Sequence, residues 1–241
     1  MSDPATERGD SAGFRTTPVS FTRRGGRLSE RQQRAWDALA EEMVLDWPGA
    51  GPSTSVDPAF VFDQAATFGR ETRLVVEVGS GRGEVIAHAA AQDRATDFLG
   101  LEVYKPGVAH TLIGIRNHEL TNVRLAIVNA AEVLATTLPE GSVDELWVHF
   151  PDPWHKKRHH KRRLVTPEFA GLAARVLRPG GVWRLATDWA EYAEQMAEVV
   201  AASPDFDGGP SERWEGRVLT RFEAKGIAAG RAIHDLTATR R

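Results

Sequence analysis

LVVEVGSGRG, residues 74–83, is the stretch of this 241-residue sequence that decides the fold. Its first five residues are apolar apart from Glu77, a pattern typical of a strand that is buried on both faces. The strand stops at glycines, and a helical pattern follows over residues 84–91. A buried strand, a glycine turn and a helix in this order are typical of a ligand-binding turn in a parallel α/β sheet.

Strand and helix patterns alternate along the rest of the chain. We expect strands at 97–102, 123–128, 143–150 and 181–186, helices at 107–119, 131–137, 167–177 and 189–202, and two weaker strands at 217–223 and 232–239. Alternation of this kind predicts an α/β fold with a doubly wound, mainly parallel, seven-stranded sheet. Helices cover both faces, and the last two strands form an antiparallel pair at one edge.

The chain divides into a flexible basic N-terminal arm, residues 1–28, and one domain, residues 29–241. The arm is rich in glycine, serine and arginine and has few apolar residues that could anchor it. The domain begins with a helix that Ser29 caps, with Gln32 and Gln33 near the capping-box position.

Composition excludes several classes of protein. The sequence is 41% apolar and 26% charged, as in soluble globular proteins. It has no cysteine, which excludes disulfides, a cysteine nucleophile and a cysteine-bound iron–sulfur cluster. No apolar stretch approaches the roughly 18 residues of a membrane span, and the N-terminus has no apolar core of a secretory signal. We therefore expect a cytoplasmic protein that does not contact a membrane.

Positive charge is concentrated in residues 155–163, HKKRHHKRR, called the basic segment below. It holds six lysines and arginines, three histidines and no acid, whereas the remaining residues carry 24 basic and 33 acidic side chains. A weaker basic region, Arg15 to Arg34, has six arginines and one acid. We expect no metal, because six cations oppose a dication. Contact with nucleic-acid phosphates is favoured over a plain solvated surface.

The glycine turn is the first candidate site. Gly79 and Gly81 permit close approach of a ligand, and Glu102 ends the next strand, where its carboxylate can accept bonds from two ribose hydroxyls. Glu77 would repel a pyrophosphate and attract an amino group, which favours S-adenosylmethionine over NAD. Asn129 ends the third strand, where an adenine edge would lie, although a simple turn residue explains it equally well.

Phe150-Pro151-Asp152-Pro153-Trp154, the Asp152 turn, is the second candidate site because it follows the fourth strand and precedes the basic segment. Two prolines stiffen the turn around Asp152, and Trp154 offers a flat surface for a base. Asp188 follows the fifth strand, where it either contacts a substrate or caps the next helix. The segment Thr220–Glu223, on the first weak strand, has little specificity by itself.

These motifs, in this order, resemble those of the bacterial tRNA (guanine-N7-)-methyltransferases. The resemblance runs from about Ser20 to the C-terminus, and residues 20–28 are similar to the family's basic lead-in. The motifs that carry it are EVGSGRG at 77–83, GLE at 100–102, FPDPWHKKRH at 150–159, KRR at 161–163, TDW at 187–189 and TRFE at 220–223. The block PDPW-x-K-x-RH-x-KRR is the most specific of them.

The resemblance implies a Rossmann-like class I methyltransferase fold, S-adenosylmethionine as methyl donor, and methylation of N7 of a guanine in the tRNA variable loop. It names tRNA as partner and indicates no obligatory protein partner. Asp152 would be the catalytic residue. The cofactor contacts would be Glu77, Glu102, Asn129 and Asp152, the substrate contacts Lys156, Asp188, Thr220, Arg221, Phe222 and Glu223, and the RNA contacts Arg158, Lys161, Arg162 and Arg163.

One departure and two alternatives stay open at this point. Many family members have Asp where this chain has Asn129, whose amide keeps an acceptor for the adenine amino group, so cofactor binding should survive. The alternative functions are a methyltransferase that acts on another RNA or a small molecule, and a non-catalytic RNA-binding module on the same scaffold.

Overall fold

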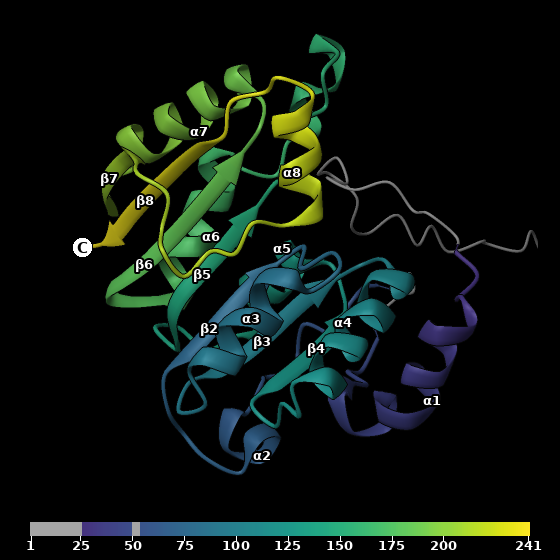
Figure 1. The fold of residues 1–241 in the computed structure, drawn as a ribbon. Coiled ribbons are helices and arrows are strands. Elements are labelled where there is room, and N and C mark those ends of the chain that lie inside the picture. Colours follow the sequence, from purple (N-terminus) through teal and green to yellow (C-terminus); the bar gives the residue numbers. More distant parts are fainter. Residues whose placement is uncertain (1–25, 50–53) are drawn as a thin grey trace, which may run out of the picture.

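The computed structural model describes residues 26–49 and 54–241, which form one sheet flanked by helices (Figure 1). The strands are β1 (Val44–Leu45), β2 (Leu74–Val78), β3 (Asp97–Glu102), β4 (Val123–Ile127), β5 (Val143–His149), β6 (Leu177–Thr187), β7 (Phe206–Ser211) and β8 (His234–Arg240). The helices are α1 (Glu30–Met43), α2 (Gln64–Phe68), α3 (Glu84–Gln92), α4 (Lys105–Asn117), α5 (Ala130–Glu132), α6 (Pro167–Val176), α7 (Ala190–Ala202) and α8 (Arg221–Ala228). A π-helical turn η1 (Val133–Thr137) continues α5, and a 3₁₀ helix η2 (Lys157–Arg162) lies in the basic segment.

The sheet has the strand order β1-β4-β3-β2-β5-β6-β8-β7 within the described residues. All pairs are parallel except β6–β8 and β7–β8, which are antiparallel. This confirms the doubly wound α/β sheet and its antiparallel edge. The predicted seven strands gain an eighth, the two-residue β1, which is too short to show a periodic pattern in the sequence.

One strand was predicted in the wrong place. Residues 217–223 lead into the first turn of α8, and the outer strand of the antiparallel pair is β7. The sequence of β7 is FDGGPS, and glycine and proline are disfavoured in strands except at a sheet edge, which is where β7 lies. Its pattern therefore does not reveal a strand.

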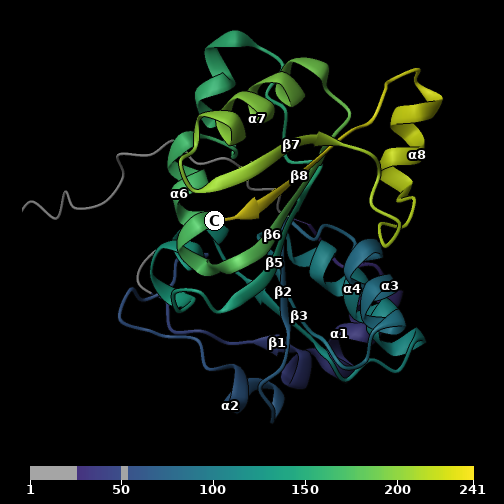
Figure 2. The same cartoon turned by 90° about the vertical axis from the view of Figure 1, so that its left-hand side faces the viewer.

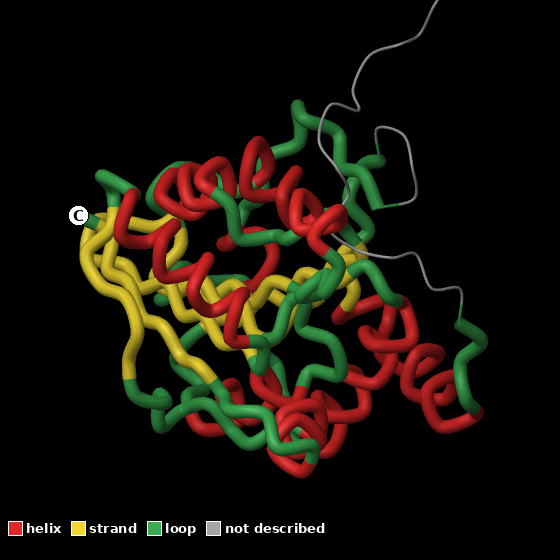
Figure 3. The backbone as a smooth tube through the Cα atoms, turned by 90° about the horizontal axis from the view of Figure 1, so that it is seen from above, coloured by secondary structure: helices red, strands yellow, loops and turns green. Residues whose placement is uncertain are grey.

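Helices cover both faces of the sheet in two separate cores (Figure 2). Helices α1, α3 and α4 bury apolar side chains against one face, around Val75, Phe98 and Trp147. Helices α6 and α7, with η1, cover the other face, around Val76, Leu146 and Trp183. Viewed from above, the sheet runs between these helical layers (Figure 3). Little of either face of the sheet is therefore open to solvent, and ligands can approach the sheet at the ends of its strands.

The chain reverses its direction across the sheet between β2 and β5. From β2 it proceeds through β3 to β4, then crosses back to β5 and continues to β6. Val78 at the end of β2 is in register with Leu101 on one side and Val148 on the other. The loops after β2, β3 and β5 therefore leave the same edge of the sheet side by side, which is where parallel α/β sheets bind ligands.

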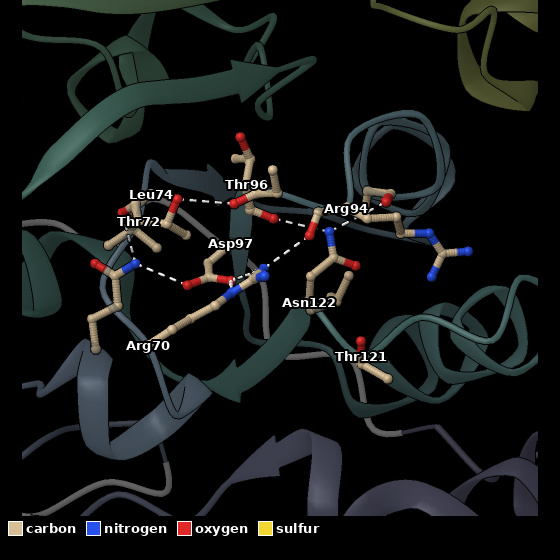
Figure 4. Close-up of polar contacts among 12 residues, drawn as sticks. Arg70, Thr72, Leu74, Arg94, Thr96, Asp97, Thr121 and Asn122 are labelled. Carbon is tan, nitrogen blue, oxygen red and sulfur yellow. Dashed lines mark hydrogen bonds and ion pairs between the residues drawn. The ribbon is translucent and has the colours of Figure 1, made fainter.

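A buried polar network fixes the opposite ends of the strands, where β3 and β4 begin (Figure 4). Asp97 at the start of β3 is fully buried and accepts bonds from Arg70 at 2.6 and 2.9 Å and from Gln64 at 2.9 Å. Asn122, just before β4, donates to the carbonyls of Ala90, Asp93 and Thr96. These bonds hold the starts of β3 and β4 in place, away from the candidate sites.

The helix predicted from Ser29 is confirmed as α1. Ser29 caps α1 and forms a capping box with Gln32. Residues 1–25 of the predicted N-terminal arm, including Arg23 and Arg24, lie outside the described residues. Within the described part of the chain, no helix has the length and apolar character needed to span a membrane.

Candidate active site

The glycine turn connects β2 to α3 and is fastened to the end of β3. Gly79 and Gly81 have φ values of 71° and 57°, in the left-handed region that strains other residues. The Gly79 amide donates to the Leu101 carbonyl at 2.8 Å, and the Gly81 amide donates to the Glu102 carboxylate at 2.7 Å. A Cβ built on Gly79 meets no atom within 4 Å, whereas one on Gly107 of α4 would lie 2.3 Å from the Gly81 carbonyl oxygen. The turn is therefore closed by α4 on one side and open at Gly79.

Glu102 is held in place by the backbone around it. It is 8% exposed, and its second carboxylate oxygen accepts from the amides of Val103 at 2.7 Å and Tyr104 at 3.0 Å. Burial raises the pKa of Glu102, and the backbone amides of Tyr104, Gly81 and Val103 oppose that rise. Each carboxylate oxygen has two lone pairs. Within the described part of the chain, both lone pairs of Oε1 are used, whereas Oε2 accepts from one amide only and can accept one further bond from a ligand hydroxyl.

Glu77 supplies a buried carboxylate that is only partly satisfied. The residue is 3% exposed, and one oxygen lies 3.3 Å from Nδ1 of His149. Its other oxygen is buried and has no hydrogen-bond partner among the residues that the structure describes. A buried carboxylate oxygen without a partner is unfavourable. The donor set therefore fits a ligand with a cationic amino group, as the sequence analysis expects for S-adenosylmethionine.

The Asp152 turn leaves β5 directly beside the glycine turn. Phe150 and Trp154 bracket it with φ values of 52° and 48°, although neither is glycine. Such conformations persist only where the surroundings impose them, and here the Phe150 amide donates to the Ala186 carbonyl at 2.7 Å. Asp152 itself is exposed. The turn thus presents a carboxylate to solvent on a constrained backbone.

The basic segment folds back over the Asp152 turn as η2. Lys156, Arg158 and Lys161 are exposed, and the Arg162 guanidinium lies 4.0 Å from the centre of the Trp154 ring. One face of this ring is therefore covered by a cation. Loss of hydration, together with the nearby positive charges, lowers the pKa of His159. At neutral pH the His159 ring is therefore uncharged.

Arg163 corrects the prediction that it contacts RNA. Its side chain is 2% exposed, so a phosphate cannot reach it. Its guanidinium donates to the Pro153 carbonyl at 2.9 Å and to Gln195 of α7 at 2.8 Å, and lies 4.9 Å from the Tyr192 ring centre. Gln195 in turn donates to the carbonyl of Val165. Arg163 therefore fastens the Asp152 turn to α7.

Asp188 follows β6 and faces α8. It is 9% exposed, and Oδ2 accepts from Nε of Arg231 at 2.8 Å. Helix α7 begins at the next residues without a side-chain cap, so the alternative that Asp188 caps this helix is wrong. A hollow of about 390 Å³ lies here, lined by Asp188, Trp189, Ala190, Glu191, Arg231, Ala232 and His234. The Trp189 ring lies 4.2 Å from that of His155, which places the hollow beside the basic segment.

The segment Thr220–Glu223 begins α8 and divides into two kinds of residue. Thr220 caps the helix, and Glu223 is fully buried, where it accepts from Arg213 and Arg217. Glu223 therefore holds the loop before α8, which corrects its prediction as a direct substrate contact. Arg221 is exposed and Phe222 is 51% exposed. The Phe222 ring lies 5.4 Å from the Phe150 ring, so α8 sits over the Asp152 turn.

Comparisons with known proteins decide the family. A family model described as "Putative methyltransferase" matches residues 71–236. The tRNA (guanine-N(7)-)-methyltransferase of Nocardioides sp. is 50% identical over 92% of this chain and 87% of its own, and that of Arthrobacter sp. is 44% identical over 95% and 89%. The chain belongs to the tRNA (guanine-N(7)-)-methyltransferase family. Among solved structures, the 16S rRNA methyltransferase KamB, 19% identical, has the same fold, with a TM-score of 0.54 over 74% of this chain and 94% of that chain.

Asn129, where the resemblance led us to expect Asp in many relatives, has an internal role in this family member. Its Oδ1 accepts from the Ala131 amide and caps α5, and its Nδ2 donates to Glu132 at 2.8 Å. Aspartate could not make the second bond and would face the Glu132 carboxylate with like charge. The contacts agree with the turn-residue alternative, and a contact with adenine stays a prediction.

Two residues of the site escaped the sequence analysis. His149, the last residue of β5, is the partner of Glu77, and only the pairing of β2 with β5 brings them together. Arg217 bonds both Glu223 and Asp235, and so connects α8 to β8. A signal for the start of α8 was present in the sequence, because Thr followed three residues later by Glu is typical of a helix N-terminus.

Glu102→Gln should weaken S-adenosylmethionine binding by about 1.5–3 kcal/mol, because bonds to a charged acceptor are removed and an amide would face backbone donors. Burial raises the pKa of Glu102, so its carboxylate becomes protonated at a higher pH than an ordinary glutamate. Affinity for the cofactor should therefore begin to fall at that higher pH as the solution is acidified. The variant has no carboxylate and should lack this pH dependence. Calorimetry across pH checks both, with Glu140→Gln, an 80% exposed acid, as control. Unchanged affinity would remove Glu102 from the ribose site.

Arg163→Lys should lower kcat while leaving the salt dependence of tRNA binding unchanged, because lysine keeps the charge but cannot bond both Pro153 and Gln195. Arg158→Lys, an exposed neighbour with the same change, is the control and should alter neither quantity strongly. The rates are compared at a temperature at which circular dichroism shows that both variants are folded. Because lysine keeps the charge, the RNA-contact alternative needs Arg163→Gln, which removes it. We expect this variant to keep the salt slope of the unaltered protein, and a flatter slope would restore Arg163 as an RNA contact.

Proposed function

We propose that this protein transfers a methyl group from S-adenosylmethionine to N7 of a guanine in the variable loop of tRNA. The observation that carries the proposal is the position of the Asp152 turn. It lies between the Glu77 and Glu102 carboxylates on one side and the basic segment on the other, at adjacent strand ends of one sheet. We propose the cytoplasm as its location and no obligatory protein partner for its activity.

The residues present fit the methyl donor. S-adenosylmethionine, when bound, supplies an activated methyl group on a positively charged sulfur. Glu77 would hold its amino group with the buried oxygen that otherwise has no partner among the described residues, and Oε2 of Glu102 would accept from its ribose. Gly79 and Gly81 have no side chain, so a ligand can approach the backbone of the turn closely. These assignments follow from the donor chemistry of the residues.

Asp152 acts by charge and position in this proposal. Guanine N7 has a lone pair in the ring plane and no proton in the neutral base, so no general base is required. Positive charge builds up on the guanine ring as N7 is alkylated, and a carboxylate beside the ring stabilises it. Asp152 can also accept from N1–H and N2–H of the base and so orient N7. The anchored turn keeps this carboxylate in position.

The basic segment would hold the RNA beside an accessible guanine. N7 of a base-paired guanine points into the narrow major groove of an A-form helix, which side chains do not enter. A loop nucleotide avoids this barrier or is turned out of its stack. Lys156, Arg158, Lys161 and Arg162 would hold the backbone beside such a nucleotide, and Lys156 lies closest in sequence to Asp152. Asp188 and the exposed Arg221 and Phe222 would meet the nucleoside itself.

The direct test is transfer of labelled methyl from S-adenosylmethionine to unmodified tRNA, followed by identification of the labelled nucleoside. We expect 7-methylguanosine, at one position in the variable loop. Label in another nucleoside, or in ribosomal RNA alone, would favour a methyltransferase with a different substrate. Tight RNA binding without any transfer would favour the RNA-binding module.

Asp152→Asn should lower turnover by about 10²–10³-fold, as the loss of one charge-stabilising group does in other active sites, with the fold unchanged. The rate of the unaltered protein should show no requirement for a deprotonated base near neutral pH. Single-turnover rates across pH measure both, with Asp207→Asn, an acid 71% exposed on β7, as the matched control. Near-normal turnover of Asp152→Asn would contradict the role of its charge.

A further inference from the structure

We propose that tRNA also rests on a second basic surface, made of Arg27, Arg31, Arg82 and Lys105. This inference rests on the proposed function and adds a second set of phosphate contacts to it. The four side chains are exposed and come from three separate stretches of the chain, namely the entry to α1, the glycine turn and the start of α4. They lie on the β3 and β4 side of β2, whereas the basic segment follows β5 on the other side.

Specific contacts hold the start of α1 against the start of α4, beside the carboxyl end of β3. Gln32 donates to the Pro106 carbonyl at 2.8 Å, and the Lys105 ammonium lies 4.1 Å from the Trp36 ring centre. A Cβ on Gly26 would be only 2.6 Å from the Pro106 ring. The basic end of α1 is thus packed against the N-terminal turn of α4, which follows β3 directly. Arg31 therefore lies near α4, close enough for its charge to lower the pKa of His110.

His110 of α4 holds Arg82 without cancelling its charge. The Arg82 guanidinium lies 2.6 Å from Nε2 of His110, and Nδ1 of the same ring lies 3.0 Å from the Arg82 carbonyl oxygen. Both contacts are satisfied together when the ring is neutral and carries its proton on Nδ1. Burial lowers the pKa of His110, and the positive charges of Arg82 and Arg31 lower it further, which favours the neutral ring. An exposed arginine in the glycine turn is thus held by a neutral partner.

The acids nearby leave the surface positive. Glu84 accepts from the backbone amide of Arg221 at 2.8 Å, next to the exposed Arg221 side chain. Glu30 is 96% exposed on its side chain and lies 3.9 Å from Arg34, a further cation of the same helix. Glu84 is thus engaged by a backbone donor and Glu30 lies beside Arg34, and among the described residues neither forms an ion pair with the four cations of the surface.

Two basic surfaces on either side of the candidate cofactor site suit a folded RNA better than a single one. A target guanine inside a loop has sugar–phosphate backbone on both its 5′ and 3′ sides. The basic segment would hold one side and the second basic surface the other, with N7 presented between them. Contacts of this kind set the orientation of the RNA without reading its sequence, so the same surface serves different tRNAs.

The test compares two double variants that remove the same charge from opposite edges of the sheet. Arg31→Ala/Arg82→Ala removes two of the four positive charges of the second basic surface. Arg116→Ala/Arg241→Ala is the matched control, since Arg116 ends α4 and Arg241 follows β8, both at the opposite edge. A third variant, Arg27→Ala/Arg31→Ala, keeps every residue of the glycine turn, and calorimetry checks that its affinity for S-adenosylmethionine is unchanged.

Binding of unmodified tRNA is measured over a range of salt concentrations, and methyl transfer to guanine N7 is measured on the unaltered protein. Both variants of the surface should weaken tRNA binding and flatten the slope of log affinity against log salt by about 1.4–1.8, since each phosphate interaction that is removed reduces the slope by about 0.7–0.9. The control should keep the original slope. Unchanged slopes in both surface variants, with N7 methylation by the unaltered protein intact, would overturn this proposal alone. No salt-dependent tRNA binding and no N7 methylation by the unaltered protein would overturn the proposed function and this proposal with it.

Discussion

The parallel pairing of β2 with both β3 and β5 is the constraint on which the rest of the structure depends. It brings the ends of three strands to one edge and makes Val78, Leu101 and Val148 neighbours in register. The glycine turn, Glu102 and the Asp152 turn are thereby adjacent, although 75 residues of sequence separate Glu77 from Asp152. A one-residue slip in either pairing would turn these side chains to the other face of the sheet.

The fold divides a run of like charges into residues with different roles. Lys156, Arg158 and Lys161 remain exposed, whereas Arg163 is buried against α7 and bonds the backbone of the Asp152 turn. A buried guanidinium is stable only with several acceptors around it, and the Pro153 carbonyl and Gln195 supply them. The proposed RNA contacts and the proposed catalytic carboxylate are therefore connected through one short segment. A change in the segment's backbone would alter both.

The sequence predicted what depends on periodicity and on strand ends, and missed what depends on pairing across the sheet. The positions of Glu77, Glu102 and Asp152 could be predicted because each lies at or beside a strand end that its own apolar run reveals, and their roles stay predictions. The burial of Arg163 and Glu223 could not be read from the sequence, because their partners, Gln195 and Arg217, are recognised only once α7 and α8 are placed. The strand β7 was missed because its glycines and proline are tolerated only at an edge.

The central claim is that the carboxyl edge of this sheet presents N7 of a guanine to the methyl donor. The most direct measurement uses tRNA transcribed with 7-deazaguanosine triphosphate, which replaces every N7 with a carbon that has no lone pair. We predict that this RNA binds with an affinity close to that of ordinary unmodified tRNA but accepts no methyl group, while the ordinary transcript is methylated to completion. Methylation of the 7-deaza transcript at the rate of the ordinary one would contradict the account.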